Sequence, residues 1–427
     1  MALIDIYSRR TAFLNELFRD YRGTPFRMQT PNWHWASSPA AVPCFVLRFR
    51  RPEGLESLFR NPSQVALGEA YIRGDVEIEG DLFEAVRLAD YVLGRAGRRS
   101  GAPGLAVRKA LAIAANRAMR GRLHSRKRDR AAIAYHYDRP PDFFRPWLGP
   151  TMAYSCAYFR DAGEDLSRAQ ENKLDLICRK LDLQAQDLFL DIGCGWGSLV
   201  FHAASRYGTA GRGITLSAQQ ARFAARRISS AKLTRNCFVE VRDYRELPRL
   251  PYRYDKMASV GMFEHVGREN LPAYFAIAWE LLKPGGLFLN HGIARSRRAP
   301  SRRDSFIDKY VFPDGDLVPL CETITHAERA GFEVRDVENL REHYAQTLRL
   351  WVQGLQKNAA AVLAEAPQEV YRIWLLYMAG SAVAFERGDI SVNQVLLRRP
   401  AREAVCLPRT REAWYTNWDA ADLSRSA

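Results

Sequence analysis

The most constraining feature of this 427-residue chain is a regular alternation of helix-like and strand-like segments that begins near Asp165. Short apolar runs, each long enough for one buried strand, are separated by stretches with helical periodicity. The predicted strands are "LFLDIG", "RGITL", "CFVEV", "KMASVGMF" and "GLFLNHGIA". Strands that alternate with helices form a parallel sheet covered on both faces, so the sequence predicts a doubly wound α/β domain. In such a sheet the ligand lies beyond the carboxyl ends of the first strands.

A glycine-rich turn follows the first of these strands. Gly193, Gly195 and Gly197 occupy alternate positions after Asp191 and directly precede a predicted helix. Residues without a β-carbon let a ligand approach the backbone closely. The spacing differs from the G-x-G-x-x-G of dinucleotide-binding turns, in which the helix amino terminus holds a pyrophosphate. The turn therefore favours a cofactor without phosphate, with Asp191 near its amino-acid end. A dinucleotide site and a tight turn without any cofactor stay open as alternatives.

The second and third strands end in polar residues where ribose and adenine would lie. An acid at the end of the second strand usually holds the ribose hydroxyls. "GITLSAQQ" has no carboxylate but offers Thr215, Ser217 and Gln220, whose neutral groups can make the same hydrogen bonds. "RDYREL", after the third strand, places Asp243 and Tyr244 near the expected adenine.

Several motifs in this order resemble one family. The glycine turn resembles motif I of S-adenosylmethionine-dependent methyltransferases, and the whole series resembles the cyclopropane-fatty-acyl-phospholipid synthases and the mycolic acid cyclopropane synthases. The series is "AYHYDRPPDFFRPWLGPTMAYSCAYF", "DIGCGWGSLVFHAASRYG", "GITLSAQQ", "GMFEHVG", "FLNHGI", "YVFPDGDLV" and "HYAQTLRLWVQGL". "GEAYIRGDVEIEGDL" looks like part of the amino-terminal domain of the bacterial, phospholipid-acting members. The resemblance implies a Rossmann-like class I methyltransferase domain that binds S-adenosylmethionine, with Tyr154 and Ser155 of "YSCAYF" at the cofactor.

The resemblance also implies an activity, the transfer of a methylene group to a cis double bond in a phospholipid acyl chain. An alkene is a poor nucleophile, so the sulfonium methyl must be held in line with the π bond. The attack leaves a carbocation, which aromatic faces can stabilise. The candidates are Tyr154, Tyr158, Phe159 and Phe263, although ordinary core packing is an alternative for each of them.

Closing the ring requires the loss of a proton, and the resembled family uses a bound bicarbonate as the base. A buried anion is costly unless its oxygens are hydrogen-bonded. By motif, the residues implied to hold it are Cys156, Glu264, His291, the backbone of Ile293, and Tyr344. Glu264 beside a bicarbonate implies a shared proton, because two close carboxylates seldom both stay ionised. Taken singly, each residue has a structural alternative: Cys156 as a small core residue, His291 as a hydrogen-bonded core histidine and Tyr344 as a packing residue.

Two segments depart from the family pattern. "HYDRPPDFF" has Arg139-Pro140-Pro141 where the family has Gly-Asn, and proline stiffens the backbone and removes donors, so His136 and Asp138 are open to a structural role. Ser381 stands where the family commonly has a cysteine. A serine is a far weaker nucleophile, so a catalytic role for Ser381 is doubtful and a packing or hydrogen-bonding role is expected.

The positive charge is concentrated in one segment. The chain carries a net charge of +15, and residues 95–130 contain 12 Lys or Arg against one acid, Asp129. Such a cluster can be a solvated helix face, a nucleic-acid patch or a contact with anionic lipid. For a protein that must reach an acyl chain, anionic lipid is favoured. The expected organisation is a small α+β domain over 1–95, a basic linker and helix over 96–130, the methyltransferase domain over 131–400 and a tail over 401–427.

The remaining expectations concern partners and location. No secretory signal, membrane span or CxxC pair is visible, which predicts a reduced, cytoplasmic protein, peripheral on the inner face of the membrane, with no metal. The expected partner is an unsaturated phospholipid rather than nucleic acid. A homodimer is compatible, but the sequence does not decide the oligomeric state. Two other functions stay open: a relative that methylates the alkene to a branched or methylene product, and a lipid-binding protein with a vestigial pocket.

Overall fold

The computed structural model describes residues 2–60, 62–99, 139–298, 305–312, 315–402 and 408–416. The chain forms two compact units. The first contains Met1–Met119 together with Ser301–Pro313 and Ala366–Val383, and the second contains the rest. Most of the basic segment, with His136 and Asp138, lies outside the described residues. The predicted domain boundaries thus stay predictions, and they did not include the two late segments that belong to the first unit.

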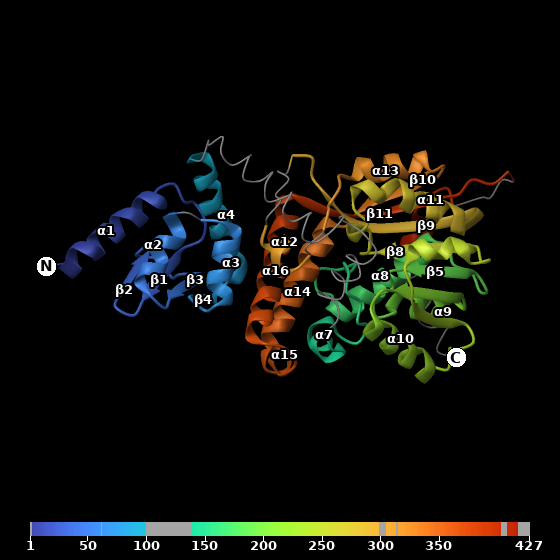
Figure 1. Ribbon diagram of the computed structural model, residues 1–427, viewed down its shortest axis with the longest axis horizontal. Coiled ribbons are helices and arrows are strands. Elements are labelled where there is room, and N and C mark those ends of the chain that lie inside the picture. Colours follow the sequence, from blue (N-terminus) through green and yellow to red (C-terminus); the bar gives the residue numbers. More distant parts are fainter. Residues whose placement is uncertain are drawn as a thin grey trace. The chain divides into compact units, whose positions relative to one another are not determined.

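The first unit is built on a four-stranded sheet with the order β2-β1-β3-β4 (Figure 1). Only β1 and β3 are parallel; the other two pairs are antiparallel. Its strands are β1 (Phe26–Thr30), β2 (Trp33–Ala36), β3 (Phe45–Phe49) and β4 (Val76–Gly80). Its helices are α1 (Ala2–Leu17), α2 (Pro52–Arg60), α3 (Gln64–Ile72), α4 (Leu82–Arg99) and α12 (Phe306–Tyr310), with most of α16 (Gln368–Arg387). The predicted small α+β region is confirmed.

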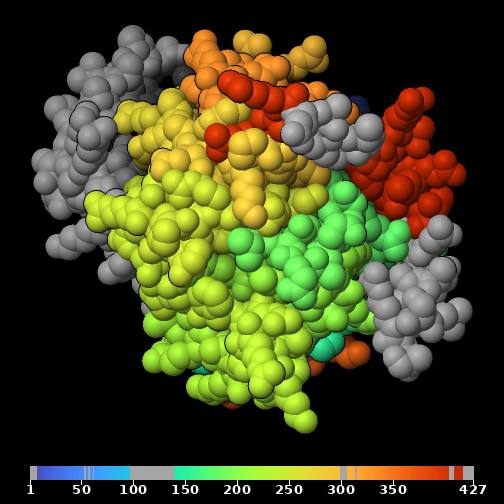
Figure 2. Space-filling model, turned by 90° about the vertical axis from the view of Figure 1, so that its right-hand side faces the viewer, coloured from blue at the N-terminus to red at the C-terminus, as the bar shows by residue number. Residues whose placement is uncertain are grey.

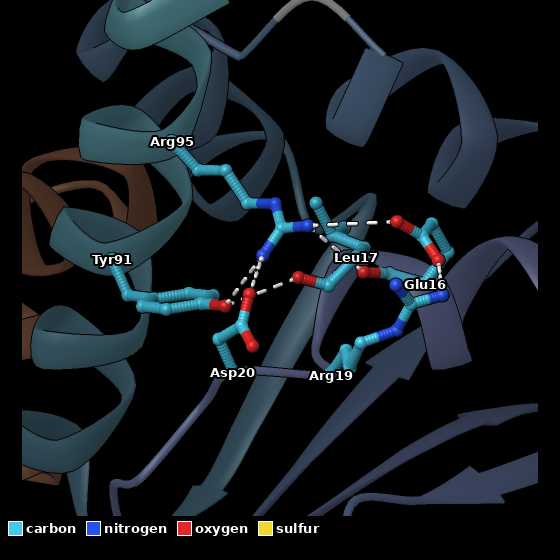
Figure 3. A network of polar contacts seen from close by, with 6 residues as sticks. All are labelled: Glu16, Leu17, Arg19, Asp20, Tyr91 and Arg95. Carbon is cyan, nitrogen blue, oxygen red and sulfur yellow. Dashed lines mark hydrogen bonds and ion pairs between the residues drawn. The ribbon is translucent and has the colours of Figure 1, made fainter.

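A polar network joins the end of α1 to α4 (Figure 3). Arg95 donates to the Asp20 carboxylate at 3.1 Å, to the Glu16 carbonyl at 3.1 Å and to the Tyr91 hydroxyl at 3.2 Å. The Tyr91 hydroxyl in turn donates to the Leu17 carbonyl at 3.2 Å. Arg95 is the first basic residue of segment 95–130, and it pairs with Asp20 inside the first unit.

The late segments contact α3 and β4 through buried or close-packed side chains. Arg372 of α16 donates to the Tyr71 carbonyl and to the Glu77 carboxylate, both at 2.6 Å. Glu69 of α3 accepts from Lys309 at 2.6 Å and from Tyr310 at 2.7 Å, both in α12. These contacts explain why segments far along the chain are part of the first unit.

The second unit contains a seven-stranded sheet with the order β10-β11-β9-β8-β5-β6-β7. Its strands are β5 (Leu188–Ile192), β6 (Ala210–Thr215), β7 (Cys237–Val241), β8 (Tyr254–Val260), β9 (Leu282–Arg295), β10 (Glu333–Asn339) and β11 (Ile390–Arg398). The five strands β5 to β9 are the predicted ones and are parallel, whereas β11 pairs antiparallel with both β9 and β10. The predicted doubly wound α/β class is confirmed.

Helices cover both faces of this sheet, as Figure 1 shows. The helices are α7 (Pro141–Leu148), α8 (Leu166–Lys180), α9 (Ser198–Tyr207), α10 (Ala218–Ser230), α11 (Leu271–Leu281), α13 (Leu320–Arg329), α14 (Arg341–Lys357), α15 (Ala359–Glu365) and α17 (Glu412–Tyr415). One core lies between the strands and α8, α9 and α10, and the other lies between the strands and α11 and α13. Figure 2 shows one face of this unit, where segments coloured green to yellow form most of the surface.

Sequence pattern accounts for the helix that precedes the first parallel strand. In α8 the apolar residues Leu174 and Ile177, spaced for one helical face and continued by Leu181 at the C-cap, are buried. Asp165 caps its amino terminus by accepting from the Arg168 amide at 3.0 Å. Within the described ranges, no helix has the length and apolar character that crossing a membrane requires.

Candidate active site

A pocket opens at the carboxyl ends of β5, β6 and β8, where β5 lies between β6 and β8 in the sheet. This is the position expected for the ligand of a doubly wound sheet. Nine of the predicted cofactor residues line it: Tyr154, Ser155, Asp191, Gly193, Gly195, Thr215, Gln220, Asp243 and Tyr244. The other two, Gly197 and Ser217, do not line it.

The three glycines form the turn after β5, and two of them, Gly193 and Gly195, line the pocket. Gly193, Gly195 and Gly197 have φ values of 77°, 54° and 79°, in the left-handed region that favours glycine. A β-carbon on Gly193 would lie 2.6 Å from Met262, and one on Gly197 would lie 2.7 Å from Ala224 of α10. Gly197 therefore allows close packing of α9 on α10, whereas Gly195 leaves open space on the pocket side.

The polar residues after β6 are organised among themselves. The Thr215 hydroxyl donates to the Gln220 side-chain oxygen at 2.7 Å. Ser217 is the N-cap of α10 and accepts from the Gln220 amide at 3.3 Å. Ser217 thus has a structural role that fixes the direction of α10 and keeps Gln220 at the pocket wall.

The acid after β7 is paired inside the protein. Asp243 accepts from Arg245 through two bonds, of 2.9 Å and 2.6 Å. Tyr244 lines the pocket beside them and packs edge-on against Tyr274 at 5.7 Å. The Asp243 charge is neutralised by Arg245 within the predicted adenine end.

The segment Tyr154–Cys156 follows the pocket wall. The Tyr154 ring packs on Trp147 and Trp351, with centroids 5.5 Å and 5.2 Å away. Ser155 accepts from the Lys173 ammonium at 2.8 Å through its hydroxyl. The Cys156 thiol is fully buried and donates to the Ala157 carbonyl at 3.2 Å. Burial raises the pKa of Cys156, so its thiol stays protonated and acts as a donor rather than a nucleophile.

Glu264 and Ile293 form a direct contact. One carboxyl oxygen of Glu264 accepts from the Ile293 amide at 2.7 Å, so this backbone donor holds the acid itself. The other oxygen, Oε2, is enclosed and makes no hydrogen bond to any described residue. Burial raises the pKa of Glu264 to about 7, and the bond from Ile293 opposes that rise. A proton on Oε2 would be a buried donor without an acceptor.

His291 lies in β9, two residues before Ile293. Its Nδ1 lies 3.3 Å from Nε2 of Gln394, which is its register partner in β11. With the Gln394 amide in this orientation, Nδ1 accepts and Nε2 carries the proton. Nε2 is enclosed and has no hydrogen-bond partner among the described residues. Burial, assisted by the charges of Lys173 and Lys180, lowers the pKa of His291 to about 3 and keeps the ring neutral.

Two buried side chains have the chemistry that an anion requires. Glu264 Oε2, when protonated, and His291 Nε2 are each a buried donor without an acceptor among the described residues, and a buried anion needs such donors. Glu264 follows Met262 and precedes His265, both of which line the pocket. The fit is partial, since Ile293 already donates to Glu264 and Cys156 to Ala157.

The remaining predicted residues are distributed between aromatic clusters and the other unit. Tyr344 of α14 packs on the ring of Phe385 at 4.8 Å. Ser381 is buried in the part of α16 that belongs to the first unit, so it is not part of the site described here. Of the four aromatic candidates only Tyr154 lines the pocket; Tyr158 stacks on His343 at 4.6 Å, and Phe159 and Phe263 pack in apolar clusters.

Two residues that line the pocket, Lys173 and Trp196, were not among the predicted site residues. Lys173 lines the pocket and is 2% exposed, and its signal in the sequence is a lysine next to Leu174 on the apolar stripe of α8. The Trp196 ring packs on Phe144 and Phe223, with each pair of centroids 5.3 Å apart. It also lines the pocket, which the sequence did not indicate.

Comparison with known proteins gives consistent similarities. The family model described as mycolic acid cyclopropane synthetase matches residues 124–395. The "Probable fatty acid methyltransferase" of Pseudomonas putida is 41% identical over 361 residues, which cover 83% of this chain and 88% of that protein. The "Cyclopropane-fatty-acyl-phospholipid synthase" of Escherichia coli K12 is 34% identical over 374 residues, covering 87% and 91%. The crystal structure of mycolic acid cyclopropane synthase CmaA1 complexed with SAH and CTAB is 35% identical and aligns with a TM-score of 0.59, covering 63% of this chain and 97% of that one.

Proposed function

The chain belongs to the mycolic acid cyclopropane synthetase family, and from this premise we propose that it transfers a methylene group from S-adenosylmethionine to a cis double bond of an unsaturated phospholipid acyl chain. Membership of the family and the class I fold make it an S-adenosylmethionine-dependent methyltransferase. The ring-forming outcome and the phospholipid substrate are the parts that are proposed.

One observation carries the proposal: two buried polar atoms without partners, Glu264 Oε2 and His291 Nε2, belong to residues adjoining a cofactor pocket. A simple methyl transfer to an oxygen or nitrogen nucleophile has no need of such a closed donor set. Ring closure does, because a proton must leave the newly added carbon in a lipid-filled site.

The proposed reaction has two stages. The π electrons of the alkene attack the sulfonium methyl, which forms a carbon–carbon bond and releases S-adenosylhomocysteine. The resulting carbocation then loses a proton from the added carbon, and the electrons of that C–H bond close the ring. Tyr154, the aromatic candidate that lines the pocket, would stabilise the cation through its π face.

Bicarbonate, when bound, would supply the base for the second stage. We propose that Glu264 and His291 hold it through their unpartnered atoms. Cys156 and Tyr344 stay candidates that only the family motifs imply. Ile293 contributes by donating to the other oxygen of Glu264, which leaves the acid proton on Oε2. His291 stays neutral because burial keeps its pKa at about 3, so it donates without adding charge.

Product analysis of matched variants tests this assignment. With purified protein, monounsaturated phospholipid vesicles and S-adenosylmethionine, Glu264→Gln should lower ring formation by at least about a hundredfold while cofactor binding persists. Cys156→Ala should lower it as well, and removing dissolved bicarbonate should slow the unaltered protein. Glu269→Gln, a nearby exposed acid, is the control and should behave like the unaltered protein. Unchanged ring formation in Glu264→Gln would refute the assignment.

A second product class is favoured by one observation. Identity to the Pseudomonas putida fatty acid methyltransferase is 41%, against 34% to the Escherichia coli cyclopropane synthase. A fatty-acyl methyltransferase would share the first stage and differ in the fate of the carbocation. Its product would be a methylene compound, which retains an alkene, or a branched chain, which requires a reductant.

A further inference from the structure

Lys173 is a buried cation with an unusual lack of charged partners. It is 2% exposed in α8, and its ammonium donates to the Ser155 hydroxyl at 2.8 Å. It makes no ion pair with any residue in the described part of the chain. Buried lysines are rarely found without an opposite charge, because an ammonium loses its hydration on burial. The ammonium donates a hydrogen bond to Ser155 and can donate further hydrogen bonds to the anionic group of a ligand.

Lys180, two turns later in the same helix, illustrates the ordinary solution. Its side chain is fully enclosed and contacts the carboxylates of Asp336, at 3.6 Å, and Glu338. The two lysines thus share a helix and a degree of burial but differ in their partners. The difference at Lys173 is that its surroundings include the pocket.

Asp191 carries the opposite charge to Lys173 when ionised, and both residues line the pocket. It is also 2% exposed and makes no ion pair with a described residue. Burial lowers the pKa of Lys173 to about 8 and raises that of Asp191 to about 7, and each charge partly offsets the shift of the other. Within the pocket wall, the other buried acid, Asp243, is already neutralised by Arg245. One acid and one base are thus left for a ligand.

We propose that Lys173 and Asp191 bind the two opposite charges of the amino-acid end of S-adenosylmethionine, Lys173 and its partner Ser155 taking the carboxylate and Asp191 the ammonium. The inference rests on the proposed function only for the identity of the cofactor. It adds Lys173, on a helix before the first parallel strand, to the cofactor-binding residues expected from the glycine turn. The zwitterion would then add a directly bound opposite charge to each buried group, beyond the partial offset that Lys173 and Asp191 give one another.

Binding of three ligands tests the inference without any turnover. S-adenosylhomocysteine carries both charges, its decarboxylated analogue carries only the ammonium, and 5′-methylthioadenosine carries neither. In isothermal titration calorimetry, Lys173→Met should lower the affinity for S-adenosylhomocysteine about ten- to a hundredfold. It should leave the other two ligands within about twofold of the unaltered protein. Retained binding of 5′-methylthioadenosine also demonstrates that the variant is folded.

Two further variants make the test specific. Asp191→Asn should weaken S-adenosylhomocysteine and the decarboxylated analogue but not 5′-methylthioadenosine. Arg245→Met, which removes the cation at the predicted adenine end, should change all three ligands by a similar factor. If Lys173→Met does not fold, Ser155→Ala replaces it and should show the same ligand selectivity with a smaller loss.

The outcomes that overturn the inference are distinct. Equal weakening of all three ligands, or no weakening of S-adenosylhomocysteine, in Lys173→Met would contradict it while leaving the lipid reaction untouched. Failure of the unaltered protein to bind S-adenosylhomocysteine would overturn the inference together with the proposed function.

Discussion

Glu264 has two carboxyl oxygens in different environments, and this difference determines its chemistry. One oxygen accepts from the Ile293 amide at 2.7 Å, and the other is enclosed without a partner. Burial raises the pKa of Glu264 to about 7. The carboxyl therefore keeps its proton at pH values well above those at which a glutamate usually ionises. A carboxyl that is neutral near physiological pH can donate to an anion, which an ionised carboxylate cannot do.

The raised pKa of Glu264 predicts a dependence of stability on pH. Between its usual pKa of 4.5 and its folded value of about 7, the folded protein keeps a proton that the unfolded chain has lost. The free energy of unfolding contributed by Glu264 therefore falls as pH rises through this window, by up to about 3 kcal/mol. Glu264→Gln removes this dependence and should gain stability relative to the unaltered protein between pH 5 and pH 8.

Denaturant unfolding at several pH values measures this gain. Asp191, whose pKa is also raised to about 7, contributes equally to both proteins and cancels in the difference. The exposed Glu269→Gln variant serves as the control and should run parallel to the unaltered protein. A constant difference between Glu264→Gln and the unaltered protein across the window would contradict the account.

At this scale the sequence predicted residue types better than residue partners. The positions of Thr215 and Gln220 at the pocket were predicted because Thr215 ends the second parallel strand and Gln220 lies in the first turn of the helix that follows. That Ile293 donates to Glu264 depends on the distance between a strand and a turn 29 residues apart, which no local pattern encodes. Lys173 was missed because a lysine in an amphipathic helix normally reaches solvent.

In the glycine turn between β5 and α9, Gly195 and Gly197 have different surroundings. A β-carbon at Gly197 would meet Ala224 at 2.7 Å, whereas one at Gly195 would meet no protein atom within 4 Å. Gly195→Ala should thus lower the free energy of unfolding by about 1–2 kcal/mol, the cost of a left-handed backbone. Gly197→Ala should lower it by about 3 kcal/mol or more, since α9 and α10 must also move apart.

Cofactor affinity should reverse this order. Gly195 lines the pocket and Gly197 does not, so Gly195→Ala should weaken S-adenosylhomocysteine more strongly than Gly197→Ala does. Thermal unfolding and calorimetry on the same two proteins provide both measurements. If Gly197→Ala caused the larger loss of both stability and S-adenosylhomocysteine affinity, the inferred roles of the two glycines would be wrong.

The elements of the sheet differed in how well the sequence revealed them. The five parallel strands are apolar and lie between helices, and all were predicted. The edge strand β10 was not, because "EVRDVEN" has only two apolar residues, three positions apart, and lacks the alternation of a typical strand, and an edge position tolerates this polarity. The departure at Pro140 and Pro141 has a simple place in the fold: they form the N-cap and first turn of α7, where proline is favourable.

For the whole molecule, the charge distribution predicts a response to salt. Residues 95–130 carry a net charge of +11, leaving +4 for the rest of the chain, and Arg95 is already engaged with Asp20. We expect neutralising the seven basic residues from Arg117 to Arg130 to weaken sedimentation with anionic vesicles, most clearly at low ionic strength. Neutralising Arg329 and Arg335, in α13 and β10, is the control. Equal sedimentation of both variants would remove the anionic-lipid proposal.

The composition of the two units shows what a linear sequence does not reveal. Segments 301–313 and 366–383 belong to the first unit although residues 120–300 lie between Met119 and the nearer of them. Their contacts include hydrogen bonds of Arg372 and Glu69 to polar groups that have no sequence signature, and the packing of the Phe306 ring against Gly68. The boundaries of compact units therefore could not be predicted from composition and periodicity alone.

The most direct measurement uses S-adenosylmethionine with a fully deuterated methyl group and a defined monounsaturated phospholipid in vesicles. Mass spectrometry and an alkene-specific reagent then identify the acyl product. If the ring forms as proposed, the added carbon should retain two of its three deuterium atoms, in a chain that no longer reacts as an alkene. A product that keeps all three deuterium atoms, one that still reacts as an alkene, or no labelled lipid at all would contradict ring formation.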